Sequence, residues 1–248
     1  MRTTITIACA VCFAFGLFAP ILRSEEKKED FEPKRITRLV ADGAFEAATI
    51  EVDRAISRAE REANTRNEWS VLNTLEVGYY MCAKAQLLAL CGDLVNAEKM
   101  LRDAESYGAT RQEFKGFLVE SGWREILSAT RGLIYEKAGR NGEAVTAYDS
   151  PTTSYGLARE ALIALGRGSD AEAEQLARKA GDSPTAYHVL GRIAEKRGDK
   201  NSAADWYQKA SAQLQKSTKS PPNSDNQFLP IYFCEGTAIT EAQKRPNK

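Results

Sequence analysis

Five glycines in the chain are each followed, five residues later, by an alanine. The pairs are Gly43/Ala48, Gly92/Ala97, Gly139/Ala144, Gly168/Ala173 and Gly198/Ala203. Glycine readily adopts the left-handed backbone that ends a helix, and alanine lets a second helix cross closely. Four residues after each alanine comes the residue expected to fill the neighbouring space, in turn Val52, Leu101, Tyr148, Ala177 and Tyr207. The spacing predicts antiparallel helical hairpins, each turning at one of these glycines.

Composition extends this prediction to a whole domain. Between residues 36 and 214 helix-forming residues dominate, and apolar residues recur at intervals of three and four, which predicts an all-α repeat domain over 36–214. The chain has 34 basic and 34 acidic side chains, with 27% charged and 43% hydrophobic residues. These values exclude a disordered chain and a multi-span membrane protein, and they argue against a strongly basic nucleic-acid binder.

The N-terminus has the pattern of an export signal. Arg2 precedes a mostly apolar stretch from Ile5 to Leu22, and a charged run follows Arg23. We therefore expect residues 1–24 to be a signal peptide or, if uncleaved, an N-terminal anchor, since the apolar stretch is just long enough to span a bilayer. Either reading predicts an exported protein that is periplasmic, secreted or membrane-anchored outside the cytoplasm.

Three more segments flank the predicted repeats. Residues 25–35, charged and containing Pro33, are expected to form a linker, and residues 215–227 a second one. Residues 228–248 are expected to be a capping segment and tail. Their apolar beginning and helix-compatible continuation would fold back over the last hairpin, because terminal repeats need caps.

Three cysteines, Cys82, Cys91 and Cys234, follow the apolar N-terminal stretch, and their spacing limits which disulfides can form. Cys82 and Cys91 are predicted on one helix, roughly 13 Å apart along its axis, which is too far for a disulfide. Free thiols and a bridge from Cys234 to one of them both remain open.

One stretch carries a recognisable repeat pattern. It reads Tyr187-x₂-Leu190-Gly191-x₂-Ala194, then Gly198, Ala203-x₃-Tyr207 and Ala210. This stretch resembles the tetratricopeptide repeat family. The units around Gly139 and Gly92 are similar to it, whereas those around Gly43 and Gly168 lack the aromatic and Leu-Gly positions. The resemblance implies a right-handed superhelix of antiparallel hairpins, with another helical-hairpin repeat family as the alternative.

The repeats are unevenly spaced. The intervals between successive turn glycines are 49, 47, 29 and 30 residues. The two long intervals leave room for lengthened helices over 45–64 and 69–90, or for an extra short helix around 112–120.

In the family, first helices line a concave groove that binds an extended peptide or a partner helix. Counting from the turn glycines gives the candidate groove residues Tyr79, Gln86, Leu133, Glu136, Tyr155, Leu162, His188, Arg192 and Glu195. Packing against the neighbouring hairpin or the capping segment is an equal alternative for them. Family members that clamp a carboxylate present Lys, Asn and Arg at groove positions that here hold Cys82, Ala129, Ala158 and His188, which argues against a cytosolic chaperone adaptor.

Signs of catalysis are few. His188 is the single histidine and has no second ligand at helical spacing, so we predict no metal site and no catalytic triad. The run from Gly166 to Ala171 fits Gly-x-Gly-x-x-Ala, but it follows a helix-forming stretch where a dinucleotide site needs a strand. We therefore predict no catalytic residue and no cofactor.

These observations favour a non-catalytic, exported protein-binding module or scaffold with a protein or peptide partner. Two alternatives stay open. One is an enzyme or ligand-binding protein whose site combines the groove with residues 228–243, and the other is a structural subunit of a homo-oligomer.

Overall fold

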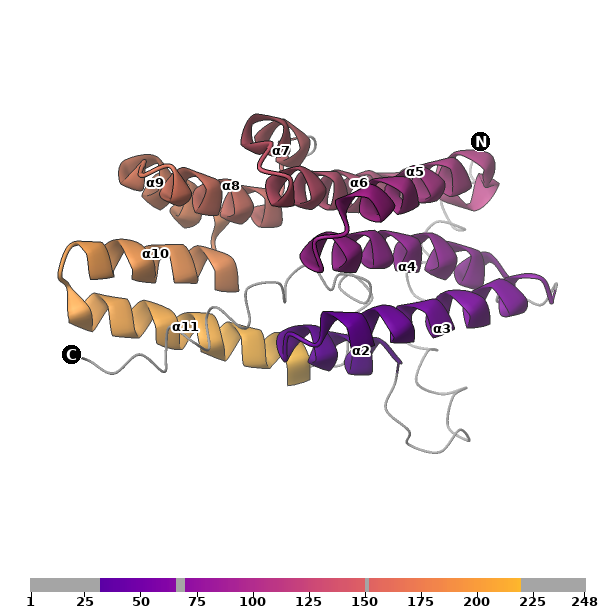
Figure 1. The fold of residues 1–248 in the computed structure, drawn as a ribbon, viewed down its shortest axis with the longest axis horizontal. Helices are drawn as coiled ribbons and strands as arrows, with labels where there is room; N and C mark the ends of the chain where they lie inside the picture. The colour runs from indigo at the N-terminus through magenta and orange to yellow at the C-terminus, as the bar shows by residue number, and fades with distance from the viewer. Residues whose placement is uncertain (1–31, 66–69, 150–151, 220–248) are drawn as a thin grey trace, which may run out of the picture.

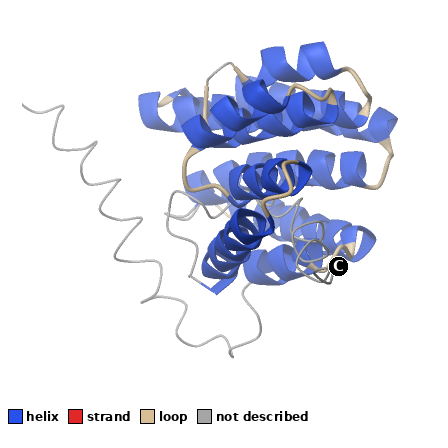
Figure 2. Ribbon diagram, turned by 90° about the vertical axis from the view of Figure 1, so that its left-hand side faces the viewer, coloured by secondary structure: helices blue, strands red, loops and turns tan. Residues whose placement is uncertain are grey.

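The computed structural model describes residues 32–65, 70–149 and 152–219. All regular structure in these ranges is helical, and Figure 2 shows no strand among them. The elements are α2 (Glu32–Ala41), α3 (Phe45–Ala63), α4 (Ser70–Leu90), α5 (Leu94–Thr110), the short 3-10 helix η1 (Gln112–Lys115), α6 (Phe117–Lys137), α7 (Asn141–Tyr148), α8 (Ser154–Gly166), α9 (Asp170–Ala180), α10 (Pro184–Lys196) and α11 (Lys200–Lys219).

Each predicted glycine joins two antiparallel helices. The hairpins are α2–α3, α4–α5, α6–α7, α8–α9 and α10–α11, and all five turn glycines have a positive φ between 73° and 85°. In the last turn the amide of Gly198 donates to the carbonyl of Glu195 (2.9 Å), and the amide of Asp199 donates to that of Ala194 (3.0 Å). The other four turns repeat this pair of bonds, which closes the helix end. The turn prediction is confirmed.

In the hairpins α4–α5, α6–α7 and α10–α11 a small residue packs against a larger one. The five alanines that follow the turns are buried. A Cβ added to Gly132 on α6 would lie 2.3 Å from Cε1 of Tyr148 on α7, and one added to Gly191 would lie 2.5 Å from Cε1 of Tyr207. Tyrosine fits these two hairpins because its ring lies directly on the helix backbone opposite. At the matching positions of α4–α5, an alanine and a leucine, Ala85 and Leu101, belong to one apolar cluster.

The hairpins stack in chain order into a solenoid-like array. First helices contact one another in succession, α4 with α6, α6 with α8, and α8 with α10. In Figure 1 the chain runs from α2 and α3 upward through α4, across α6 and α8, and down through α10 to α11. The end of α11 returns to α2, where Leu214 joins the apolar cluster of Ile36 and Val40. The array is therefore an arch whose last helix contacts its first.

The uneven spacing has two physical sources. Helices α3 and α4 are 19 and 21 residues long, which confirms the predicted lengthening. Helix η1 confirms the predicted short helix, and its buried Phe114 packs with Trp123, ring centroids 4.6 Å apart. A Cβ on Gly78 would lie 2.7 Å from Cζ of Phe114, so α4 approaches this ring closely. The long repeats thus gain their own aromatic core.

Two predicted boundaries are wrong. Helix α2 begins at Glu32, inside the predicted linker 25–35. Proline is tolerated in the first turn because the N–H that it lacks would have no partner within the helix there. Helix α11 continues to Lys219, past the predicted end at 214 and into the predicted linker 215–227.

The signal or anchor of residues 1–24 and the capping segment 228–248 lie outside the described residues, as does Cys234. No helix among the described residues is long and apolar enough to cross a membrane.

Candidate functional site

Much of the predicted groove is interior. Gln86, Leu133, Tyr155 and His188 are all buried, so they cannot form an open partner surface, and their prediction is corrected. Tyr155 packs against Tyr148 of the preceding hairpin, with ring centroids 5.9 Å apart, and His188 packs against Tyr207 of its own hairpin, with centroids 5.8 Å apart. Gln86 on α4 donates through Nε2 to Oγ1 of Thr130 on α6 (2.7 Å). Gln86, Tyr155 and His188 thus each contact another helix of the array.

Glu136 also has an internal role. Its Oε2 accepts a hydrogen bond from the Tyr148 hydroxyl (3.0 Å) and another from Nε of Arg159 on α8 (3.0 Å). A second Arg159 nitrogen, Nη2, pairs with Oε1 of the same carboxylate. The Arg159 side chain is only 2% exposed, and burial raises the pKa of Tyr148 well above its usual range. This buried fork joins α6–α7 to α8–α9.

The other predicted residues are more accessible. Tyr79 and Leu162 are partly buried, and Tyr79 packs edge-on against Trp123 with centroids 5.8 Å apart. Arg192 and Glu195 on α10 remain at the surface. The structure therefore does not bring the nine predicted residues together into one open groove.

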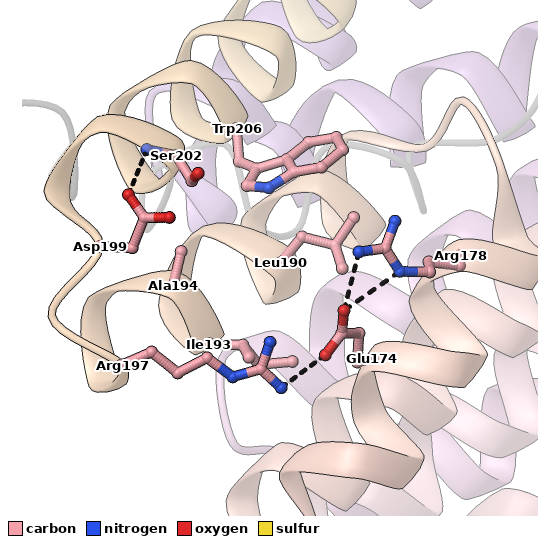
Figure 3. Close-up of a pocket in the computed structure, with 9 residues that line it drawn as sticks. All are labelled: Glu174, Arg178, Leu190, Ile193, Ala194, Arg197, Asp199, Ser202 and Trp206. Atoms are coloured by element: carbon pink, nitrogen blue, oxygen red, sulfur yellow. Dashed lines mark hydrogen bonds and ion pairs between the residues drawn. The ribbon is translucent and has the colours of Figure 1, made fainter.

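A different surface feature lies on the last two hairpins. It is a shallow pocket of about 220 Å³ between α9, α10 and α11 (Figure 3). We call it the α9–α11 pocket, and it is lined by Glu174, Arg178, Leu190, Ile193, Ala194, Arg197, Asp199, Ser202 and Trp206. The apolar residues of α10 form its floor, whereas the charged residues come from α9 and from the α10–α11 turn.

One carboxylate holds two arginines at the rim. Glu174 Oε1 accepts hydrogen bonds from Nη2 (2.7 Å) and Nε (3.1 Å) of Arg178. Its Oε2 accepts one from Nη2 of Arg197 (2.6 Å). The bonds from Arg178 and Arg197 lower the pKa of Glu174, so it stays ionised at neutral pH and both guanidinium groups stay in place. With Asp199, the pocket is lined by two arginines and two carboxylates, so its charged residues carry no net charge.

An aromatic wall completes the pocket. Trp206 stacks on Tyr187 with ring centroids 5.7 Å apart and planes at 22°. The Lys209 ammonium lies 4.2 Å from the Trp206 centroid, within the range of a cation–π contact. At the start of α11 Asp199 accepts from the Ser202 amide (3.0 Å), and hydrogen bonds from the Ser202 side chain and then from this amide lower the pKa of Asp199. The pocket can therefore hold an apolar side chain beside cations.

Sequence reasoning missed this pocket because its residues come from three helices and are spread over positions 174–206. Counting groove positions on first helices alone leaves out Trp206 and Arg197. The one usable signal was Trp206 itself, a large aromatic on a second helix next to the packed Tyr207. Within the described part of the chain no group of three or more His, Cys, Asp or Glu is placed to hold a metal ion.

Comparison with known proteins adds no relative. No protein-family model matches the chain, and no curated protein shows significant similarity to it. The fold and the α9–α11 pocket are therefore the features that point to a function.

Proposed function

We propose that this chain is an exported, non-catalytic protein-interaction module, similar to tetratricopeptide repeat proteins, that binds a protein or peptide partner. The observation that carries the proposal is the α9–α11 pocket, where Trp206, Arg178 and Arg197 surround an apolar floor. Tryptophan, tyrosine and arginine are the residues that most often dominate the binding energy of protein interfaces. Tyr187, stacked on Trp206, adds the remaining member of this group.

The pocket favours a particular kind of partner segment. Leu190 and Ile193 offer apolar surface to an apolar side chain, whose burial is worth about 1.5–3 kcal/mol. Each guanidinium group has five N–H donors, and the bonds to Glu174 use only some of them. A partner carboxylate beside the apolar side chain would accept from them. We therefore propose a segment with an acidic residue next to an apolar one.

Export and the family resemblance remain parts of this proposal. Export is supported by the apolar N-terminal pattern of residues 1–24, which lie outside the described structure. The resemblance is supported by the stack of hairpins with glycine turns. Stacked hairpins suit this function because they offer extended surfaces and leave their outer side chains available.

Capture with a matched pair of variants tests the proposal. The full chain is used as bait on its native envelope fraction, as wild type, as Arg197→Glu and as Arg102→Glu. Arg197 and Arg102 have comparably exposed side chains (56% and 65%), and each pairs with a glutamate, but only Arg197 lines the pocket. We expect one stoichiometric protein with wild type and Arg102→Glu that is lost with Arg197→Glu. Equal capture by all three, or capture of the bait alone, would contradict the proposal.

A further inference from the structure

In the third hairpin, α6–α7, an arginine of the following helix binds the glutamate that the hairpin's tyrosine contacts. In α6–α7 the ring of Tyr148 lies on Gly132, and its hydroxyl bonds to Glu136 (3.0 Å). Arg159 of the following helix, α8, then clamps the same carboxylate with two nitrogens. The Glu136 side chain is 16% exposed as a result. A tyrosine–glutamate pair in this arrangement thus forms a receptor for a guanidinium group.

The last hairpin repeats the receptor. In α10–α11 the ring of Tyr207 lies on Gly191, and its hydroxyl bonds to Oε2 of Glu195 (2.7 Å). The tyrosine follows the glutamate by twelve residues in both hairpins. The two receptors therefore share the same glycine, the same ring position and the same acceptor oxygen.

The two receptors differ in what lies on the glutamate. Helix α11 ends at the last described residue, Lys219, so no described helix follows it in the position that α8 has after α7. Glu195 has a 37% exposed side chain, and its ion pair in the described residues is with Arg192 of its own helix, at 3.9 Å. This distance is too long for a hydrogen bond. The carboxylate of Glu195 is accessible to a further cation.

We infer that residues 228–245 of this chain dock on the face of α10–α11 that carries Glu195. In this arrangement Arg245 pairs with Glu195 and Tyr207 as Arg159 pairs with Glu136 and Tyr148. The segment begins with the apolar residues Phe228, Leu229, Ile231, Tyr232 and Phe233 and ends with the basic residues Lys244 and Arg245. It therefore supplies apolar side chains for packing and a guanidinium group for the carboxylate of Glu195.

Chain length allows this arrangement. Tyr207 lies twelve residues before Lys219, which is about 18 Å of helix. The 26 residues from 220 to 245 span roughly 39 Å even if all were helical, so a segment that turns back after Lys219 reaches the level of Tyr207. Its covalent attachment also gives it a high effective concentration, which favours it over a free partner. This inference does not depend on the proposed function.

Cysteine labelling of the reduced full-length protein tests the inference. Cys234 lies in the segment, exposed Cys91 is the accessible reference and buried Cys82 the protected one. The alkylation rate of each is compared with its own rate in the denatured protein by mass spectrometry. We expect Cys234 to be protected about tenfold more than Cys91, because docking must open before it reacts. Glu195→Gln and Arg245→Gln should each remove that protection, and the double variant should remove no more than either.

Glu98→Gln is the matched control, since the Glu98 side chain is 40% exposed and also faces an arginine of its own helix. It should leave Cys234 protected, and circular dichroism should show every variant folded. Three results would overturn the inference. Cys234 could react as fast as Cys91. Its protection could survive Glu195→Gln, which places the segment elsewhere. Its protection could also fall on dilution, which makes a second copy of the chain the occupant.

Discussion

The third and the last hairpin have the same interior and different surroundings. Both place a tyrosine ring on a helical glycine and bond its hydroxyl to a glutamate. In α6–α7 that glutamate is a buried joint, because Arg159 of α8 covers it. In α10–α11 the equivalent Glu195 remains 37% exposed. The small–large pair builds the hairpin, and the next helix decides whether its acidic group is structural or available for binding.

The largest effect is expected from breaking the buried joint. Arg159→Met leaves Glu136 without its clamp, and losing one partner of a buried ion pair costs about 3–5 kcal/mol. The same change in the last hairpin, Arg192→Met, should cost less than about 0.5 kcal/mol, because that pair is exposed and 3.9 Å long. Urea unfolding followed by circular dichroism measures both. Equal losses would mean that the two glutamates do not differ as described.

The stability of the protein near this buried ion pair should depend on pH, because Glu160 lies next to Arg159 in the sequence. Glu160 is buried on α8, and burial, then Asp149 and Glu172, raise its pKa to about 7. Since its pKa is higher in the folded than in the unfolded protein, the folded state binds this proton more tightly. Stability from Glu160 is therefore full below about pH 4.5 and is lost as the pH rises through 7.

Glu160→Gln removes this dependence. We expect the variant to be more stable than wild type at pH 8, by up to about 3 kcal/mol, and to gain little at pH 4.5. Thermal unfolding at the two pH values measures the difference. Glu143→Gln, which changes an exposed glutamate that does not act on Glu160, is the control. A gain that is the same at both pH values would show that Glu160 is not protonated on folding.

A smaller loss is expected in both hairpins from filling the glycine opposite the ring. Gly132→Ala and Gly191→Ala each push a methyl group into a buried tyrosine. Overpacking costs about 1–3 kcal/mol, and the better helix propensity of alanine returns up to about 1 kcal/mol. We expect a net loss of about 1–2 kcal/mol at each site by urea unfolding. A stabilised variant at either site would contradict the close approach of ring and helix.

The smallest effect on stability is expected at the α9–α11 pocket. Arg197→Gln removes one surface bond to Glu174 and should lower the free energy of unfolding by less than about 0.5 kcal/mol. The Arg197→Gln variant would then lose partner binding while the protein stays folded. A loss above about 2 kcal/mol would show that Arg197 is a structural residue like Arg159.

The hairpins were predictable because turn chemistry is local. A glycine with a positive φ and an alanine at a helix crossing depend on a few neighbouring residues, and Gly198 with Ala203 is a clear case. The end of a helix was less predictable, since Pro33 is equally compatible with a linker and a first helical turn.

The site was harder to predict because it depends on distances between helices. Leu133 and Tyr155 have the spacing of groove residues, but both are buried, and Tyr155 packs edge-on against Tyr148 of the preceding hairpin. The α9–α11 pocket joins residues of three helices, and Glu174 meets Arg197 across 23 positions of sequence. Such a meeting follows from the stacking of two hairpins, which spacing within one hairpin does not specify.

In the third and last hairpins a tyrosine ring packs directly on a helical glycine, and a double-mutant cycle in the last hairpin measures how much this contact holds the two helices together. Gly191→Ala, Tyr207→Leu and the double variant convert the last hairpin to the alanine–leucine pair that α4–α5 uses at Ala85 and Leu101. We predict that the double variant loses at least about 1 kcal/mol less than the sum of the two single variants, as expected for residues in direct contact. Losses that add to within about 0.5 kcal/mol would contradict the claim.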